Sequence, residues 1–474
     1  MERVEVHFDA QIAEDVVFRN AWVPNFQARR LKGAWFLSNP AGGWLMVNDD
    51  EYEHLLSVAV PWTLFRKAEQ RHLILTEANM ESFFDSYRRW TTPHFRHPTH
   101  HIIVSTLRCN LACTYCHVAV VAPSSGPEYD LTTATADAIL EFALNSKAEA
   151  QSFEFQGGES LLNKDVLFHA IPRIKDAYRA AGKDVSISIQ TNATLLNDHL
   201  AAFFREYDVS LGTSVDGPQS VHDAQRVFVG GRGSYETVTK KAAKYDLPVL
   251  PTVTNNSLAA WTEIVDMQLA KGTKTVTFQN VYPINSAASN WSKVGISAAS
   301  FLEIYDSVVE YLRSLWTEGY YPLERRFRLA LRKLYTGRDV DYADFGNPCG
   351  MIHSQIAYHL NGDIYTCDEG RDFPEFKLGN VSTDEYDEVI FGQRARQLKT
   401  LSLPNDPECL TCAYRPVCTT CPVYERAATG ELRSAHAGTD KCRQTIYIYD
   451  KLLSWLAGDV GLLEKLAAYH GLTS

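Results

Sequence analysis

Short apolar runs alternate with longer amphipathic stretches between residues 101 and 335 of the chain. Apolar runs between turn residues are typical of buried strands, and apolar residues at intervals of three and four are typical of helices. This pattern predicts strands near 102–106, 152–156, 185–191, 209–215, 248–254 and 275–280. It predicts helices near 132–145, 164–181, 197–207, 235–245, 258–271 and 298–316.

Strands that alternate with helices of this length indicate parallel βαβ units and an α/β fold. Six such units are too few to close an eight-stranded barrel, so we expect an open, partial (βα)6 barrel. Active sites of such barrels lie at the C-terminal ends of the strands. The loops that follow the predicted strands are therefore the places to look for chemistry.

Residues 1–95 form a separate first unit, in which apolar runs at 35–38 and 44–47 surround a Gly-rich turn and predict two strands. One helix is expected to end at Leu56 and another to span about 77–90. This order resembles the small winged-helix domain with which peptide-maturation enzymes recognise peptides. A plain cap that packs on the barrel is the alternative. The expected N-caps are Asp49 or Asp50 and Thr76, and residues 94–101 are expected to be an extended linker.

From residue 340 onward the chain is rich in loops. The apolar runs 356–360 and 363–367 are joined by an Asn-Gly pair, which is typical of a two-residue hairpin turn. A final apolar helix is expected over about 446–455. We therefore divide the chain into an N-terminal unit, a barrel and a C-terminal unit, at 1–95, 96–339 and 340–474.

The chain has a formal net charge of −11, which argues against a nucleic-acid-binding protein, because such proteins need basic faces. A basic helix near 325–333 is the exception, and it is either a solvated face or a site for an acidic peptide. No apolar run reaches the roughly 18 residues of a membrane span. The first residues lack the basic-then-apolar pattern of a signal peptide. We therefore expect a cytoplasmic protein without a membrane partner.

The ten cysteines fall into two groups. Three lie between 109 and 116, seven lie between 349 and 442, and none lies between 117 and 348. Cysteines of a cytoplasmic protein rarely form structural disulfides, so they are expected to bind metal or to react. Scattered core cysteines would not leave such a gap, whereas two separate metal-bearing regions would.

Cys109, Cys113 and Cys116 form a C-x3-C-x2-C trio directly behind the first predicted strand. Three thiolates in one loop can hold three corners of a four-iron cluster and leave one iron open. Zinc would instead require four ligands in a closed tetrahedron. The trio, with Tyr115 before its last cysteine, resembles the signature of the radical SAM superfamily. The resemblance implies that S-adenosylmethionine binds the open iron.

The loops after the next three strands carry polar motifs in the order found in the same family. The resemblance implies that the Gly-Gly-Glu of 157–159 lies at the methionine amino group, although Ser160 replaces the family's Pro. It places Asn192 and Ser214 near the ribose and Arg226 near the carboxylate. Each motif alone is explained by a plain feature, Asp216-Gly217-Pro218 by a turn and Arg226 by a surface ion pair, whereas four at successive strand ends favour the family. The implied S-adenosylmethionine-binding residues are Tyr115, Gln156, Gly157, Gly158, Glu159, Asn192, Ser214 and Arg226.

The C-terminal cysteines, read alone, suggest a zinc site, because they include C-x2-C pairs. Behind the barrel they resemble the SPASM extension, which holds two auxiliary clusters, so three [4Fe-4S] clusters are implied in all. The inner cluster would then lack one ligand, supplied by water, a non-Cys side chain or the substrate. One spacing departs from the family, with two residues instead of three before Cys421. The implied ligands are Cys409, Cys412, Cys418 and Cys442 for the outer cluster and Cys349, Cys367 and Cys421 for the inner one.

Asp368 directly follows Cys367. In anaerobic sulfatase-maturating enzymes, which this Cys-Asp pair resembles, the carboxylate serves as the base. A carboxylate beside a cluster can take up a proton as the substrate is oxidised. The alternative is that Asp368 only accepts backbone hydrogen bonds in a turn.

Over nearly its full length the chain resembles SPASM peptide maturases, and the stretches 101–110, 153–159, 362–365 and 376–380 resemble the His-Xaa-Ser system maturases. The resemblance implies that a 5′-deoxyadenosyl radical starts the oxidation, most simply the cross-linking, of a small ribosomally made precursor peptide. It also implies a one-electron reductant of the flavodoxin or ferredoxin type. The alternatives are a formylglycine-generating sulfatase maturase, a SPASM dehydrogenase of a small molecule, and a zinc-stapled scaffold that binds peptides without catalysis.

Overall fold

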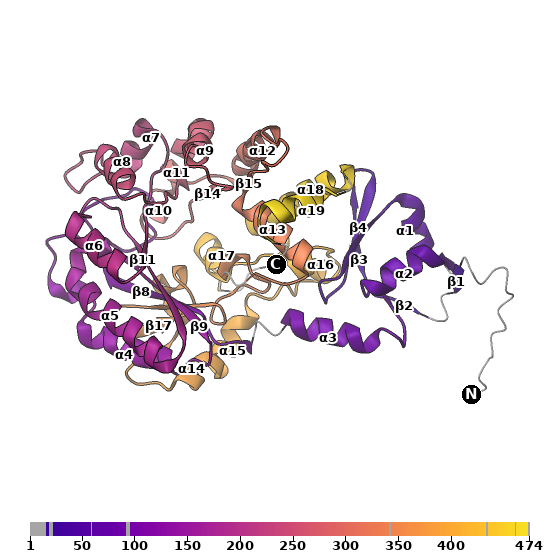
Figure 1. Cartoon of the computed structure of the whole chain (residues 1–474), viewed down its shortest axis with the longest axis horizontal. Helices are drawn as coiled ribbons and strands as arrows, with labels where there is room; N and C mark the ends of the chain where they lie inside the picture. Colours follow the sequence, from indigo (N-terminus) through magenta and orange to yellow (C-terminus); the bar gives the residue numbers. More distant parts are fainter. Residues whose placement is uncertain are drawn as a thin grey trace.

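A seven-stranded sheet runs through the larger part of the molecule (Figure 1). In this computed structural model β8–β11 are parallel, β16 lies parallel to β8, and β17 and β18 follow antiparallel. The strand order is β11 (Val209–Gly212), β10 (Asp184–Gln190), β9 (Ala150–Gly157), β8 (His100–Thr106), β16 (Gln355–Tyr358), β17 (Asp363–Tyr365) and β18 (Lys377–Asn380). The structure describes residues 16–18, 22–57, 59–91, 95–340, 343–432, 435–459 and 461–472.

Helices cover the outer face of β8–β11 and share one hydrophobic core with these strands. Phe153 and Phe155 of β9 are fully buried in that core, because alternate residues of the strand face the helices. The prediction of a partial (βα)6 barrel is confirmed. The covering helices are α4 (Thr133–Leu144), α5 (Lys164–Ala181) and α6 (Asp198–Glu206).

The second half of the barrel is built from much shorter strands than the sequence predicts. The predicted strand 248–254 is reduced to two residues, because Pro248 and Pro251 cannot donate ladder hydrogen bonds. The predicted strand 275–280 is divided in two. Parallel pairs form between β12 (Thr252–Val253) and β14 (Gln279–Asn280), and between β13 (Thr275–Val276) and β15 (Leu323–Glu324).

Seven helices accompany this second half among the described residues, and four of them agree in position with expectation or nearly so. The short α7 was not predicted. The helices are α7 (Gln219–Gln225), α8 (Tyr235–Lys244), α9 (Trp261–Leu269), α10 (Ser286–Ser289), α11 (Trp291–Val294), α12 (Ala298–Ser314) and α13 (Arg325–Thr336).

The N-terminal unit contains the predicted strand pair in a three-stranded sheet of order β3-β4-β5. The predicted cap of its first helix is wrong, because Asn48 rather than Asp49 or Asp50 forms the capping box, together with Glu51. The last helix begins at Met80, later than expected, and α2 was not predicted. The elements are β1 (Val16–Phe18), β2 (Val23–Pro24), β3 (Gln27–Leu31), β4 (Ala34–Ser38), β5 (Trp44–Val47), α1 (Asp49–Leu56), β6 (Ala59–Pro61), α2 (Trp62–Gln70), β7 (Ile74–Leu75) and α3 (Met80–Thr91).

The expected linker ends earlier than predicted, because His100 and His101 already belong to β8. His101 is fully buried, and its Nδ1 lies 2.8 Å from the Tyr358 hydroxyl of β16. Burial lowers the pKa of His101 to about 3, so the ring is neutral. The two histidines are therefore sheet residues and not part of the linker. Residues 92–94 and the N-terminal residues 1–15, where a signal pattern was sought, lie outside the described part.

The C-terminal unit continues the barrel sheet through its predicted hairpin and then forms helices beside the N-terminal sheet (Figure 1). β16, which lies after residue 340, pairs with β8 of the barrel, so the sheet crosses the predicted boundary. The division of the chain at residue 340 therefore stays a prediction. The helix expected over about 446–455 is longer in the structure, as α18, and α19, which follows it, was not predicted. The helices are α14 (Tyr386–Phe391), α15 (Gln393–Thr400), α16 (Pro407–Leu410), α17 (Pro422–Thr429), α18 (Asp440–Gly458) and α19 (Leu462–Tyr469).

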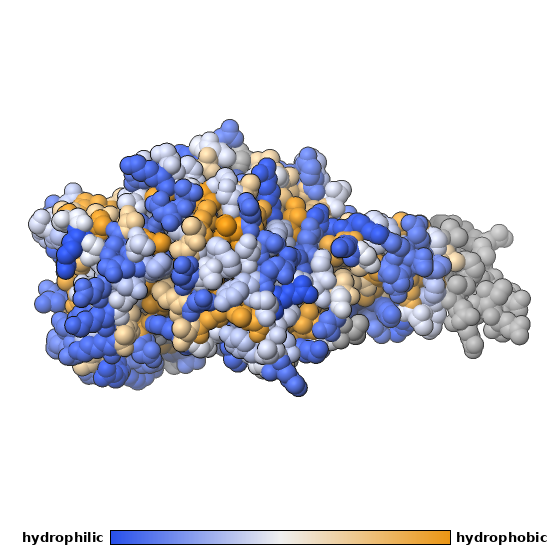
Figure 2. Space-filling model, turned by 90° about the horizontal axis from the view of Figure 1, so that it is seen from above, coloured by the Kyte–Doolittle hydropathy of each residue, from blue (hydrophilic) through white to orange (hydrophobic). Residues whose placement is uncertain are grey.

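The N-terminal sheet is joined to the rest of the molecule by a shared core. Leu31, Phe36 and Trp90 are buried together with residues of α12, α13, α18 and α19. Seen from above, the molecule narrows toward this unit, and the visible face carries several separate hydrophobic patches (Figure 2). Among the described residues, no helix is both long and apolar enough to cross a membrane.

Candidate active site

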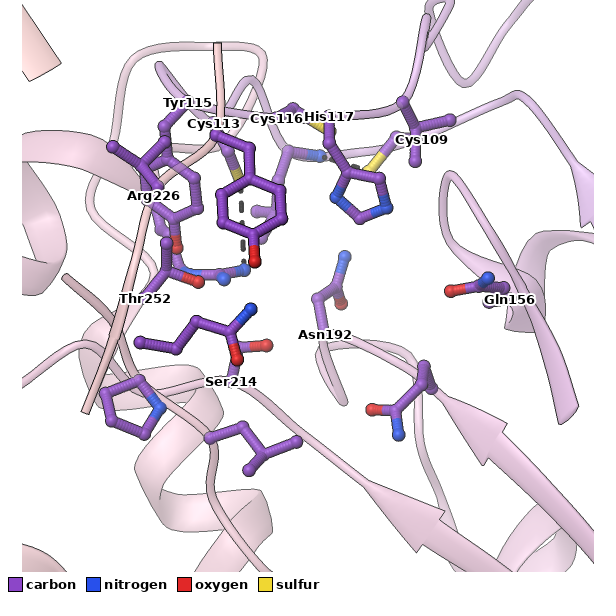
Figure 3. A pocket seen from close by; sticks show the side chains of 18 of the residues that line it. Cys109, Cys113, Tyr115, Cys116, His117, Gln156, Asn192, Ser214, Arg226 and Thr252 are labelled. Carbon is purple, nitrogen blue, oxygen red and sulfur yellow. Dashed lines mark hydrogen bonds between the residues drawn. The ribbon is translucent and has the colours of Figure 1, made fainter. Parts of the chain in front are cut away.

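The loop that follows β8 carries Cys109, Cys113 and Cys116 across the C-terminal end of the barrel. Backbone hydrogen bonds hold it at several points, including Cys109 N to Val121 O at 3.0 Å and Thr114 N to Gln225 O at 2.9 Å. The loop is therefore fixed to neighbouring segments rather than to its own residues alone. Its three cysteines lie on the side that faces the barrel mouth, as expected for a βα loop (Figure 3).

A cavity of about 330 Å³ lies below the cysteine loop. Side chains from several strand ends point into it (Figure 3). Seven of the eight residues predicted to bind S-adenosylmethionine line it, Glu159 being the exception. The lining includes Cys109, Cys113, Tyr115, Cys116, His117, Gln156, Gly157, Gly158, Asn192, Ser214, Arg226, Thr252, Asn280, Tyr282, Arg325 and Glu369.

The glycine pair after β9 lets the cysteine loop pack directly on the strand. Gly157 has a φ of +136°, which favours glycine, and a Cβ there would collide with the carbonyl oxygen of Thr106. A Cβ on Gly158 would collide with the carbonyl oxygen of Arg108 and lie 2.9 Å from that of Leu107. The pair is therefore required by the approach of two backbones as well as by any ligand.

Replacing Gly158 by Ala is expected to lower the free energy of unfolding by about 1–3 kcal/mol, because overpacking against backbone forces the cysteine loop to shift. Gly230→Ala is the control, since a Cβ at that position meets nothing within 4 Å. Anaerobic urea denaturation measures both variants. Equal stability of the two variants would show that the loop moves without strain.

Glu159 is fully buried and does not line the cavity. Its carboxylate accepts hydrogen bonds from Leu161 N at 3.0 Å, Thr191 Oγ1 at 2.6 Å and Asn192 N at 2.7 Å. Burial raises the pKa of Glu159, and these hydrogen bonds lower it. In this structure the residue joins the ends of β9 and β10 and thereby positions Asn192.

Asn192 connects two walls of the cavity. Its Nδ2 donates to Asn110 Oδ1 of the cysteine loop at 2.8 Å, and its Oδ1 accepts from Thr194 N at 3.0 Å. Ser214 lines the cavity after β11. Both residues therefore present polar atoms at the barrel mouth, where the sequence placed them.

Arg226 is anchored by a buried carboxylate that sequence reasoning treated as part of a turn. Asp216 Oδ2 accepts from Arg226 Nε at 2.9 Å and from the Tyr115 hydroxyl at 2.6 Å. The guanidinium lies 5.1 Å from the centre of the Tyr115 ring, and its Nη1 is 3.9 Å from Cys113 Sγ. Asp216 is fully buried, so it fixes Arg226 and Tyr115 as one unit against the cysteine loop.

His222 supports this unit from behind. Its Nδ1 accepts from Asp216 N at 3.4 Å and its Nε2 lies 2.9 Å from Ser234 Oγ, so the ring must stay neutral. Burial lowers the pKa of His222 to about 4. An unfolded His titrates near 6.5, so between pH 6.5 and 4 the unfolded chain binds more protons than the folded one. The free energy of unfolding therefore decreases as the pH falls through this range.

The His222→Gln variant is expected to lose less stability than the wild type between pH 7 and pH 5. The difference should be about 2 kcal/mol, the value of roughly 1.5 pKa units between 6.5 and 5. Anaerobic denaturant titrations at the two pH values measure it. Equal pH dependence of the two proteins would show that His222 titrates normally in the fold.

The thiols of the trio are buried and close enough to influence one another. Burial raises the pKa of Cys109 and Cys113 to about 12, Arg226 lowers these values, and the other thiols of the trio raise them further. Such thiols become thiolates only when a positively charged group replaces their protons. Three of them around one cavity therefore fit a metal cluster.

The C-terminal cysteines fall into the two predicted groups. Those of the outer group line one pocket, and those of the inner group are packed in one buried hydrophobic core with Tyr282. Among the described residues, no three His, Cys, Asp or Glu side chains converge on a single point for one metal ion. A multi-iron cluster binds each cysteine to a different iron, so its ligands lie further apart than the four ligands of one tetrahedral zinc ion. The groups are Cys409, Cys412, Cys418 and Cys442, and Cys349, Cys367 and Cys421.

Asp368 lies behind the cavity wall and is not one of its lining residues. Gln156 Nε2 donates to its Oδ1, Arg371 forms an ion pair with it, and His117 Nε2 lies 3.3 Å from its Oδ2. Gln156 and His117 line the cavity and so link Asp368 to it. Glu369, the next residue, lines the cavity directly. The positions of His117, Glu369 and Arg371 could not be predicted, because no recognised motif includes these residues.

Residues 103–259 match the family model of the radical SAM superfamily, and residues 349–422 match that of the SPASM iron–sulfur cluster-binding domain. The serine-type anaerobic sulfatase-maturating enzyme of Bacteroides thetaiotaomicron is 26% identical over 352 residues, which are 68% of this chain and 82% of that protein.

Two solved structures share the fold. The native sulfatase-maturating enzyme anSMEcpe with bound AdoMet has a TM-score of 0.66 at 19% identity, covering 78% of this chain and 100% of that one. SuiB of Streptococcus suis bound to the precursor peptide SuiA has a TM-score of 0.53 at 14% identity, covering 90% of this chain and 100% of that one.

The two family-model matches include most of the residues that line the cavity and six of the seven C-terminal cysteines, Cys442 lying beyond residue 422. The cofactors are S-adenosylmethionine and iron–sulfur clusters, and three clusters fit the SPASM family. The alternative of a zinc-stapled scaffold without catalysis is therefore wrong. The chain is a radical SAM enzyme with a SPASM iron–sulfur domain, homologous to the anaerobic sulfatase-maturating enzymes.

Proposed function

We propose that this SPASM-type maturase oxidatively cross-links a small, ribosomally made precursor peptide. The observation that carries the proposal is the position of the cavity beside two cysteine groups. The trio lines it, and Tyr282, which also lines it, is packed in one buried hydrophobic core with Cys349, Cys367 and Cys421. A substrate in the cavity is therefore close to the site that starts an oxidation and to a site that can receive an electron.

The cysteines are proposed to hold three clusters. The trio holds the one that binds S-adenosylmethionine, Cys349, Cys367 and Cys421 hold the inner auxiliary cluster, and the remaining four hold the outer one. When bound, the first cluster and S-adenosylmethionine supply a radical that removes a hydrogen atom from the substrate. The protein's part is to orient these groups and to exclude water.

The polar residues of the cavity are proposed to orient S-adenosylmethionine. Arg226 faces the trio with its charge fixed by Asp216 and would pair with the carboxylate of the methionine part. Asn192 and Ser214, at the ends of β10 and β11, would bind the ribose. All three are held by elements of the barrel, so little reorganisation is needed when the ligand binds.

Asp368 is proposed to accept the proton that leaves the substrate on oxidation. Its carboxylate lies behind the cavity wall, and His117, which lines the cavity and lies 3.3 Å from it, would pass the proton to it. The hydrogen bond from Gln156 and the pairing with Arg371 orient the carboxylate. The electrons that start each turnover are proposed to come from an external flavodoxin- or ferredoxin-type reductant.

A peptide substrate is supported by the likeness to the sulfatase-maturating enzymes and by the likeness to SuiB. SuiB was solved with its precursor peptide SuiA and matches 90% of this chain, more than the 78% matched by anSMEcpe. The N-terminal sheet and helices are proposed to take part in peptide recognition, with a plain cap as the alternative.

Co-expression of the enzyme with each short peptide encoded beside its gene tests the proposal. The expected result is one peptide that loses two hydrogens and resists fragmentation between the joined residues in tandem mass spectrometry. The trio variant with three Ala residues, which should not modify any peptide, is the matched control. Unchanged masses for all neighbouring peptides would refute the proposal.

A formylglycine-generating sulfatase maturase is the second candidate. The relatives that this chain matches over most of their length are named anaerobic sulfatase-maturating enzymes. It predicts that a sulfatase-derived peptide is converted at a single Cys or Ser to an aldehyde. Aldehyde-reactive labelling of such a peptide after incubation with the enzyme distinguishes the two candidates. Labelling without any cross-link in neighbouring peptides would favour this one.

A further inference from the structure

The β3–β4 hairpin of the N-terminal unit packs on the loop that joins two outer-group cysteines. Ser38 Oγ donates a hydrogen bond to the carbonyl oxygen of Ala413, which directly follows Cys412. The Phe36 and Tyr414 ring centres are 5.5 Å apart, and both side chains lie in one buried core. The N-terminal sheet thus packs directly against the loop between Cys412 and Cys418.

Arg29 of β3 brings a positive charge to the same loop. Its Nε and Nη2 each lie 2.6 Å from a carboxylate oxygen of Asp450, and the guanidinium lies 5.2 Å from the centre of the Tyr414 ring. The Tyr414 hydroxyl donates to Asp450 Oδ1 at 2.6 Å. Arg29, Asp450 and Tyr414 therefore form one connected group on the loop that begins at Cys412.

We propose that the N-terminal sheet is part of the outer cluster's site, and that Arg29 is a positioning residue that holds the Cys412 loop and tunes the cluster's reduction potential. A bidentate pair fixes the guanidinium, so its charge has a defined place against Tyr414 of the Cys412 loop. Positive charge stabilises the more negative, reduced state of a cluster. The inference rests on the proposed assignment of Cys412 and its three partners as cluster ligands. Its consequence is that the N-terminal unit is not a detachable module.

The chain offers a matched control in the next residue of β3. Arg30 also forms an ion pair and stacks on an aromatic ring, but its partners are Asp49 and Trp35, and Trp35 packs against a different core from Tyr414. Arg29→Gln removes the charge beside Cys412, and Asp450→Asn leaves that charge without its counter-ion. Arg29→Lys keeps the charge and guards against loss of folding. The four variants therefore separate charge from packing.

The test is an EPR-monitored redox titration of the full-length, anaerobically purified enzyme, with the outer cluster assigned by its absence in Cys442→Ala. Arg29→Gln is expected to shift the midpoint to more negative potential, changing the reduced-to-oxidised ratio about tenfold, which is about 59 mV for a one-electron couple. Asp450→Asn is expected to shift it the other way. Arg30→Gln and Arg29→Lys should stay at the wild-type value.

Two results would overturn the inference. The first is a wild-type potential in Arg29→Gln, and the second is a shift of the same sign in Arg29→Gln and Asp450→Asn, which a purely structural role would produce. Iron counting separates this failure from that of the ligand assignment. A Cys442→Ala protein that keeps its full iron content would refute the assignment itself, and the inference with it.

Discussion

Joint replacement of Cys109, Cys113 and Cys116 by Ala is expected to abolish cleavage of S-adenosylmethionine completely. The three thiols face one cavity with the residues proposed to bind S-adenosylmethionine, and the described structure offers no other cysteine group there. Iron should fall from about 12 to about 8 per chain, because one of three four-iron clusters is lost. Chromatography of 5′-deoxyadenosine and anaerobic iron and sulfide assays measure the two effects.

The variant also carries its own control for folding. The auxiliary cysteines lie in separate pockets of the C-terminal unit, so their clusters and EPR signals should persist. Cleavage of S-adenosylmethionine by this variant would contradict the mechanism. Loss of all iron would instead show that the three sites assemble together.

Asp368→Asn is expected to separate cleavage of S-adenosylmethionine from product formation. The substitution keeps the shape of the side chain and can still accept the hydrogen bond from Gln156, but it cannot take up a proton. Product formation should fall by about 10²–10⁴-fold, the usual contribution of a general base, while 5′-deoxyadenosine still accumulates. Both products are quantified in the same reaction by mass spectrometry.

Glu369→Gln is the matched control, because Glu369 is adjacent in sequence and lines the cavity directly. We expect it to keep most product formation. If Glu369→Gln loses product formation and Asp368→Asn does not, Glu369 is the base. If Asp368→Asn also stops cleavage of S-adenosylmethionine, the residue serves the shape of the cavity and not proton transfer.

The first half of the barrel could be predicted closely because its signals are local. The helix expected at 164–181 has the same bounds in the structure, where Gly182 ends it in a left-handed conformation. The strands at 150–157 and 184–190 alternate apolar and polar residues over most of their length. The period of the apolar residues and the capping residues are sufficient to predict the elements where each strand is covered by the next helix.

The second half could not be predicted as well, because tertiary contacts decide it. The basic helix near 325–333 looked like a solvated face, yet Arg326 and Lys333 of α13 are buried. Lys333 pairs with buried Asp339 at 2.9 Å, a partner that no local pattern reveals. The parallel pairing of β16 with β8 joins residues about 250 positions apart and was likewise invisible in the sequence.

The candidate site was predictable where a motif marks it and not where support comes from elsewhere. Seven of the eight residues expected to bind S-adenosylmethionine meet at one cavity. Asp216 was read as part of a turn, although it anchors Arg226 and Tyr115. Arg371, the buried partner of Asp368, belongs to no motif at all. Such supporting contacts become visible only when the strand ends are assembled.

Hydrogen transfer from a deuterated peptide to S-adenosylmethionine-derived product tests the central claim most directly. The purified enzyme is incubated anaerobically with S-adenosylmethionine, a chemical reductant and a neighbour-encoded peptide that carries deuterium on its side-chain carbons. The account predicts deuterium in 5′-deoxyadenosine together with a peptide that has lost two hydrogens. Unlabelled 5′-deoxyadenosine with unchanged mass for every such peptide would contradict it.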